Sequence, residues 1–341
     1  MTDFATLPAA ERRLIVDQVA TRVGVVPVIV EKDFWVCWVL GRTFVTPEMG
    51  PHVVFKGGTS LSKVFGVIDR FSEDADLSVM PAALGFAEID LNEAPSASQR
   101  RKRMAALAAR CAAHVQERFQ PALEAAIADA LGESPTRTPW LRFEMDALAD
   151  TPNLWFAYPS VLPQPGGYVA KQVKLELGSL TNQQPIGRHA IEPLLASALG
   201  SVYADFSVEV AVLELARTFW EKATILHAEY HRPAEQVPRD RFARHYSDFA
   251  ALWRHSSRPQ ALARLDVLQD VAQHKSRFFA SSWAHYQTAV PGSFRLVPPE
   301  HRHVALSLDY AAMRPMFLRE PAPFPEVMQQ LAGAEQAINS M

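Results

Sequence analysis

The spacing of apolar residues divides the chain into a first part that mixes strands with helices and a second part that is mainly helical. Residues 8–46 carry apolar residues at helical spacing, and the Ala-rich segment 98–131 predicts one long helix. Five short apolar or alternating runs predict strands, at 53–56, 75–79, 143–146, 153–158 and 168–177. The last run reads YVAKQVKLEL, an alternation that is typical of a half-buried strand.

The pattern becomes mainly helical after Pro185. Apolar residues then recur at helical spacing over 207–231, 238–255 and 259–279. We therefore expect an α/β (α+β) domain over residues 1–190, including helices at its N-terminus, and a mainly helical domain over residues 191–341.

Composition narrows the class of protein only slightly. The 341 residues suffice for one large or two ordinary domains. A formal net charge of −3 gives no overall attraction to nucleic acid, so such a contact needs a local basic surface. Cys37 and Cys111 lack metal-type spacing, which favours a reducing, cytoplasmic location. No apolar run approaches the roughly 18–20 residues that cross a bilayer, so we expect no membrane association.

A glycine turn follows the first predicted strand, in the sequence KGGTSLSK. Small residues after a strand can present backbone N–H groups to an anion, and the short helix predicted over 60–65 would aim its N-terminus at the same point. A glycine pair can equally mark only a tight turn, and lysines beside turns are usually solvated. The candidate phosphate-binding residues are Lys56, Gly57, Gly58, Thr59, Ser60 and Lys63.

An acidic couple, Asp74 and Asp76, lies at the start of the next predicted strand, Asp74 directly before it and Asp76 within it. Their side chains point to the same face because the side-chain period of a strand is two. Carboxylate oxygens on one face suit Mg²⁺ or Mn²⁺, which also take substrate phosphates as ligands. Ser72 shares this face and could hydrogen-bond a phosphate, or cap a local turn. Phosphate cradle and metal carboxylates together indicate phosphoryl or nucleotidyl transfer.

Two charged residues share a face of the alternating strand, Lys174 and Glu176. If this strand pairs beside the strand of Asp74 and Asp76, Glu176 supplies a third carboxylate and Lys174 a phosphate contact. The alternative is a paired polar face on a half-exposed strand.

The helical part carries a third group of charged residues. Arg244 and Asp248 are one helical turn apart and therefore lie on one face, among apolar neighbours that would bury part of that helix. A buried charge needs a partner or a function, and the same holds for Lys222. The alternative is a surface ion pair worth a few tenths of a kcal/mol.

These segments resemble a known family. KGGTSLSK at 56–63 and RFSEDADL at 70–77 are similar to the AbiEii/AbiGii-type nucleotidyltransferase toxins, which include the MenT toxins. The similarity extends to KLELG at 174–178, the helix of Lys222 and RHYSD at 244–248, and so covers most of residues 50–255.

The resemblance implies a polymerase β-like nucleotidyltransferase domain with a mixed sheet, followed by a mainly helical domain that contributes to the active-site cleft. The family's metal-binding carboxylates fall on Asp74 and Asp76, its serine on Ser72, and its later lysine and aspartate on Lys222 and Asp248. The implied activity is Mg²⁺-dependent transfer of a nucleotide from a nucleoside triphosphate to RNA. The favoured acceptor is the 3′ end of tRNA, which would block translation, and a cognate antitoxin protein is the implied partner.

Several functional alternatives stay open at this point. The same fold could transfer a nucleotide or a phosphate to a protein hydroxyl, or serve as a catalytically inactive nucleotide-binding module. Within the favoured mechanism, Lys222 would neutralise charge on the triphosphate and either Glu176 or Asp248 would accept the proton of the attacking hydroxyl.

Overall fold

A computed structural model describes residues 1–87, 92–147, 149–163, 170–199 and 205–341. The chain divides into two compact units. The first unit combines residues 1–64 with 72–212, and the second combines residues 65–71 with 213–341. Their status as separate domains, with a boundary near residue 190, stays a prediction.

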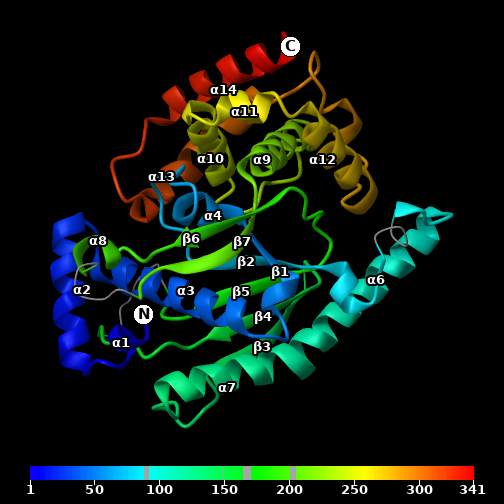
Figure 1. Ribbon diagram of the computed structural model, residues 1–341. Helices are drawn as coiled ribbons and strands as arrows, with labels where there is room; N and C mark the ends of the chain where they lie inside the picture. The colour runs from blue at the N-terminus through cyan, green and yellow to red at the C-terminus, as the bar shows by residue number, and fades with distance from the viewer. Residues whose placement is uncertain (88–91, 148, 164–169, 200–204) are drawn as a thin grey trace. The chain divides into compact units, whose positions relative to one another are not determined.

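A seven-stranded sheet is the centre of the first unit (Figure 1). Its strand order is β3-β4-β5-β2-β1-β7-β6. β2 is antiparallel to β1 and parallel to β5, and β4 is antiparallel to both β3 and β5, so the sheet is mixed. The α/β fold class with a mixed sheet is therefore confirmed. The strands are β1 (Val53–Lys56), β2 (Asp74–Val79), β3 (Leu141–Asp146), β4 (Thr151–Phe156), β5 (Val173–Gly178), β6 (Ile186–Ile191) and β7 (Val208–Leu213).

Helices of the first unit surround this sheet. The predicted long helix is present as α6, a π-helical turn at Val115–Phe119, and α7, which follow one another as a nearly continuous rod in Figure 1. The helices are α1 (Thr2–Thr6), α2 (Ala9–Val23), α3 (Pro27–Val45), α4 (Gly57–Lys63), α6 (Ala97–His114), α7 (Gln120–Leu131) and α8 (Ala196–Leu199).

The two faces of the central strands differ in polarity. Ala75 and Leu77 of β2 lie opposite Leu175 and Leu177 of β5, and all four are buried. Helix α3 runs across this apolar face, where Trp38 stacks on Phe156 at 5.7 Å between ring centroids. Burying a large apolar side chain contributes about 1.5–3 kcal/mol, so this face holds the unit together. The alternation places the charged residues of β2 and β5 on the opposite face.

The strands β6 and β7 both lie after Pro185, where the sequence predicted mainly helical structure. The helix predicted from residue 207 is wrong in its first turns, because Val208–Leu213 form a strand and α9 begins at Leu215. Val208, Val210 and Val212 are β-branched and alternate with other residues, which is a strand pattern, but it runs directly into the helical pattern of α9. The predicted helix at 60–65 also differs: α4 begins at Gly57 and ends at Lys63.

The strand predicted at 168–177 is only partly covered by the described residues. Residues 168 and 169 lie outside them, and β5 begins at Val173.

The second unit is helical, apart from one isolated bridge among its described residues. Arg70 pairs with Phe317 in an antiparallel bridge, and Phe71 N donates to Met316 O at 2.7 Å, so the segment 65–71 is held in this unit by backbone bonds. The helices are α9 (Leu215–Tyr230), α10 (Ala243–Arg254), α11 (Arg258–Leu262), α12 (Leu265–Phe278), α13 (His303–Ala312) and α14 (Phe324–Asn339).

No helix among the described residues combines the length and apolar character that a bilayer crossing requires.

Candidate functional site

The charged residues of β2 and β5 lie side by side on one face of the sheet. In the parallel pairing of these strands, Asp74 is opposite Lys174 and Asp76 is opposite Glu176. On the other side of β2, Lys56 of β1 is opposite Asp76. The two charged strands are thus neighbours, which is the condition under which Glu176 and Lys174 were expected to join the acidic couple. These five residues form the polar face discussed below.

The surroundings of Asp74 disfavour the ionised form of its carboxyl group. Burial raises its pKa to about 6, and the neighbouring charges of Asp76 and Glu73 add to the rise. Lys174 and Lys32 act in the opposite direction without cancelling it. The ionised form of Asp74 is therefore disfavoured in the folded protein. A bound cation would stabilise it, because the cation compensates for the lost hydration and for the repulsion by the neighbouring carboxylates.

The donor set fits a hard divalent ion with few protein ligands. Among the described residues there is no group of three or more His, Cys, Asp or Glu side chains that could hold a metal. Mg²⁺ and Mn²⁺ need only one or two carboxylates, because water and phosphate oxygens complete their coordination. Asp74 and Asp76 meet that need. Glu176 accepts a hydrogen bond from Lys174 Nζ at 2.9 Å, so its role as a third carboxylate stays a prediction.

Gly57 lies directly against the carboxylate of Asp76. Its φ is +83°, and a Cβ at this position would overlap Asp76 Oδ2. Only glycine satisfies both conditions. The close approach brings the first turn of α4, whose leading N–H groups have no partner within the helix, next to the acidic couple.

The hydroxyl groups of the same turn have structural partners. Thr59 Oγ1 donates to the backbone carbonyls of Ser72 and Asp74, and Ser60 Oγ donates to Gly57 O at 2.9 Å. Thr59 therefore fastens α4 to the start of β2. A phosphate held here would meet the backbone of the turn, and Ser72 contributes a carbonyl to its support.

Lys63 is tied to the scaffold. It forms an ion pair with the buried Asp33 of α3, and its Nζ lies 3.4 Å from Glu192 O. Asp33 also accepts from Leu194 N at 2.6 Å. Lys63 thus links α4 to α3, and its predicted contact with a triphosphate competes with this pair.

Three consecutive charged residues of α3 were missed by the sequence interpretation. Glu31, Lys32 and Asp33 are each at most 2% exposed. Glu31 accepts from Ser160 Oγ and Val161 N, both at 2.7 Å, and Lys32 Nζ donates to Glu73 Oε2 at 2.8 Å. Each therefore anchors a different segment, and Lys32 supports the residue that precedes Asp74. The signal in the sequence was the charged triplet inside the apolar helix VIVEKDFWVCWVL.

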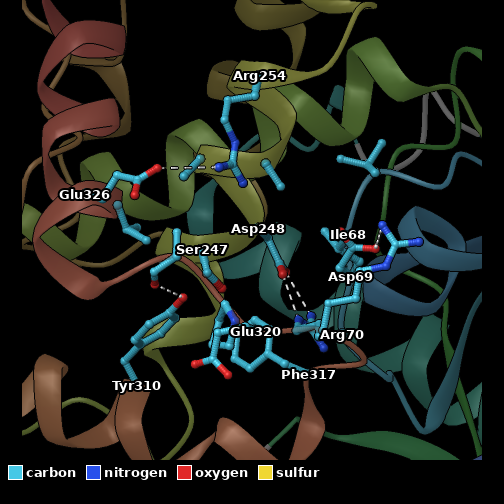
Figure 2. Close-up of a pocket in the computed structure, with 17 residues that line it drawn as sticks. Ile68, Asp69, Arg70, Ser247, Asp248, Arg254, Tyr310, Phe317, Glu320 and Glu326 are labelled. Atoms are coloured by element: carbon cyan, nitrogen blue, oxygen red, sulfur yellow. Dashed lines mark hydrogen bonds and ion pairs between the residues drawn. The ribbon is translucent and has the colours of Figure 1, made fainter. Parts of the chain in front are cut away.

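The second unit contains a different aspartate, Asp248, which is fully enclosed by cations. It is 1% exposed, and Arg70 binds it with Nε to Oδ1 at 2.8 Å and Nη2 to Oδ2 at 2.9 Å (Figure 2). Lys222 Nζ donates to Oδ2 at 2.7 Å and lies 3.2 Å from His245 Nδ1. The partners of Asp248 thus come from outside its own helix. Arg70 was missed as a partner, although it opens the RFSEDADL segment.

The titration behaviour of this network follows from its charges. Burial alone would raise the pKa of the Asp248 carboxyl, but Arg70 and Lys222 lower it well below its usual range. Burial, followed by the charges of Lys222 and Arg244, lowers the pKa of His245 well below its usual value, which suits a neutral ring that accepts from Lys222. Burial also lowers the pKa of Lys222, against the effect of Asp248. Asp248 is consequently a poor proton acceptor and a good anchor for Lys222.

A pocket of about 360 Å³ opens beside this network in the second unit (Figure 2). Arg70 and Asp248 lie on one of its walls, and Ile68, Tyr310 and Phe317 are among its apolar lining. At its rim, Arg254 forms a loose ion pair with Glu326 at 4.0 Å.

Comparison with protein families gives one match, to the family described as "Nucleotidyl transferase AbiEii toxin, Type IV TA system". The match spans residues 38–332, well over half of the chain, and it includes the strands of both the acidic couple and Lys174 as well as α9 and α10. A search of the curated proteins finds no match.

Proposed function

The chain belongs to the AbiEii nucleotidyl transferase toxins of type IV toxin–antitoxin systems, and from this premise we propose that it transfers a nucleotide from a nucleoside triphosphate to an RNA acceptor. The acceptor we favour is the 3′ end of tRNA, whose modification would block translation. Asp74 and Asp76 on one face of β2, beside Lys174 and Glu176, are the observation that carries the proposal.

Asp74 and Asp76 would hold Mg²⁺ or Mn²⁺. Such an ion, when bound, supplies a Lewis acid that stabilises charge on the reacting phosphoryl group. The raised pKa of Asp74 supports this assignment, because the chain itself leaves that charge insufficiently compensated.

The triphosphate would lie along the turn that follows β1. Gly57 and Gly58 would present their N–H groups to its phosphates, with Thr59 and Ser60 keeping the turn in shape and Lys56 beside Asp76. Lys174 is the second candidate phosphate contact on the polar face, and Lys63 would need to leave Asp33 to act as a third.

Proton removal from the attacking hydroxyl is assigned to Glu176. Its side chain is 31% exposed and lies opposite Asp76, whereas both oxygens of Asp248 are occupied by Arg70 and Lys222. The new bond forms between the acceptor oxygen and the α-phosphorus, the bond to pyrophosphate breaks, and the proton passes to the carboxylate.

We also propose, on the family resemblance alone, that Lys222, Arg244 and Asp248 take part in this reaction. Asp248 fixes the ammonium group of Lys222 at 2.7 Å, and the role we propose for Lys222 is to neutralise charge on the triphosphate. Arg244 would provide a further phosphate contact. We also propose a cytoplasmic location and a cognate antitoxin protein as partner.

The test is to incubate the protein with α-labelled nucleoside triphosphates, Mg²⁺, and either total tRNA or total cell protein. The proposal expects label in the RNA fraction, lost on chelation of the metal. Label confined to the protein fraction would replace RNA with a protein hydroxyl as the acceptor. Absence of both label transfer and Mg²⁺-dependent nucleotide binding would exclude transfer to RNA as well as transfer to a protein hydroxyl.

A further inference from the structure

Strand β4 carries three polar side chains whose hydrogen-bonding needs are not met. Thr151 Oγ1, Asn153 Oδ1 and Trp155 Nε1 are each buried and have no hydrogen-bond partner among the described residues. Asn153 as a whole is only 2% exposed. A buried polar atom without a partner costs about 1–3 kcal/mol, and native proteins keep few of them. Three on one strand indicate a site that a ligand completes.

These three residues share one face of the sheet, and it is the polar face. They lie two residues apart along β4, so their side chains point the same way. The register places Trp155 opposite Lys174 and Asn153 opposite Glu176. β4 is two strands away from β2, which corresponds to roughly 10 Å between these residues and the acidic couple.

Trp155 lies between two cations. The guanidinium carbon of Arg142 is 5.5 Å from the centre of the indole ring, and Lys174 Nζ is 5.9 Å from it. Alternating cations and aromatic rings are the means by which proteins bind single-stranded nucleic acid. Arg142 is 58% exposed, and its ion-pair partner among the described residues is Glu144 at the surface, so its side chain can move aside without leaving a buried charge.

The direction of the reaction places the acceptor on this side of the acidic couple. In phosphoryl transfer the attacking and leaving oxygens are roughly in line. The turn proposed to hold the pyrophosphate follows β1, which borders β2 on one side, whereas β5 and β4 extend from its other side. An attacking hydroxyl opposite the pyrophosphate therefore comes from above β5 and β4.

We propose that Trp155, Asn153 and Arg142 form the binding site for the terminal nucleotide of a single-stranded RNA acceptor. The base stacks on the indole ring, the amide of Asn153 bonds its edge, the indole N–H donates to the sugar–phosphate backbone, and Arg142 contacts the adjoining phosphate. This inference rests on the proposed function and sharpens it, since a protein hydroxyl offers neither a base nor a phosphate to these residues.

The test compares W155A, W155F and N153A with the unmodified protein in two assays. The first measures KM for the RNA acceptor and for the nucleoside triphosphate separately. The second measures binding of a short fluorescein-labelled single-stranded RNA by anisotropy, without nucleotide, so that it does not depend on turnover. W253A is the matched control, because Trp253 also carries a stacked arginine, Arg258 at 4.8 Å from its ring centre, but lies in the second unit.

We expect W155A to weaken RNA binding and raise KM for RNA by roughly five- to a hundredfold, as for the loss of one base–aromatic stack. KM for the triphosphate should stay unchanged, W155F should keep most of the affinity, and N153A should lose less than W155A. Circular dichroism checks that each variant is folded. R142Q tests the same site by a substitution at an exposed residue, which leaves the buried side chains unchanged.

Outcomes separate this inference from the proposed function. Normal RNA binding by both W155A and R142Q, or an equal loss in W253A, would overturn the acceptor site even if the protein transfers nucleotides to RNA. Loss of RNA binding in W155A, together with an absence of nucleotidyl transfer by the unmodified protein, would keep the site and reject the proposed reaction.

Discussion

The surroundings of Asp74 in the first unit and of Asp248 in the second shift the pKa of a buried carboxyl group in opposite directions. Asp74 is half-buried beside Asp76 and Glu73, and its pKa rises to about 6. Asp248 is 1% exposed between Arg70 and Lys222, and its pKa falls far below the usual range. The first arrangement leaves charge for a cation to neutralise, whereas the second is already neutralised by the chain. Both are aspartates in segments that resemble the same family, and the sequence alone does not show that their charges are compensated so differently.

The largest effect is expected from breaking the enclosed pair. Removal of one partner of a buried ion pair leaves the other charge without compensation, which costs about 3–5 kcal/mol. Asp248→Ala should therefore lower the free energy of unfolding by that amount in urea denaturation. Arg70→Ala should cost a similar amount, and the double variant less than the sum of the two. Additive losses would show that the pair does not couple the two residues.

The acidic couple should respond in the opposite direction. Because the folded-state pKa of Asp74 lies above its unfolded value, ionisation of Asp74 destabilises the protein, by nothing below about pH 4 and fully above about pH 6. Asp74→Asn should therefore raise the free energy of unfolding by about 1–2 kcal/mol at neutral pH, after allowance for its partial exposure. The gain should vanish near pH 4. A loss of stability at neutral pH would contradict this reading.

Metal affinity should follow the same titration. Protons compete with a cation for Asp74 below a pH of about 6, so the apparent affinity for Mn²⁺ should fall up to about tenfold for each pH unit below that value and level off above it. Calorimetric titration of Mn²⁺ between about pH 5 and 8 measures this. A flat profile through pH 6 would mean that Asp74 is not a ligand.

The smallest effect is expected at the rim of the pocket in the second unit. Arg254 and Glu326 are about half exposed and 4.0 Å apart, so the pair is worth at most about 1 kcal/mol. Arg254→Ala thus serves as the control for Arg70→Ala, since both arginines border the same pocket (Figure 2). Equal unfolding free energies for Arg254→Ala and Arg70→Ala would contradict the claim that the buried pair of Arg70 contributes more to stability than the exposed pair of Arg254.

Local sequence patterns predicted which charged residues share the polar face. The spacing of Asp74 and Asp76 fixes their common side on a strand, and the alternation of YVAKQVKLEL does the same for Lys174 and Glu176. Their pairing needed only one further condition, that the two strands be neighbours, which the sheet meets.

Long-range partners could not be read in this way. Arg70 and Asp248 are 178 positions apart, and no local period reports such a contact. The helical spacing of Arg244 and Asp248 suggested a pair within one helix, but the aspartate takes its partners from α9 and from the segment before β2. Strand β7 was not predicted for another reason. Its alternating valines run directly into the helical pattern of α9, and no turn residue separates the two patterns.

Nucleotidyl transfer by aspartate variants tests the central claim most directly. Label transfer from an α-labelled triphosphate to tRNA would be measured for the unmodified protein, Asp74→Asn, Asp76→Asn and the surface control Asp17→Asn, with unfolding curves for each. The account predicts that both variants of the acidic couple are folded but lose transfer by a factor of at least about a thousand, as expected for loss of several kcal/mol of metal stabilisation, while Asp17→Asn remains active. Retained transfer in a folded Asp76→Asn protein would contradict the assignment of the polar face as the reaction centre.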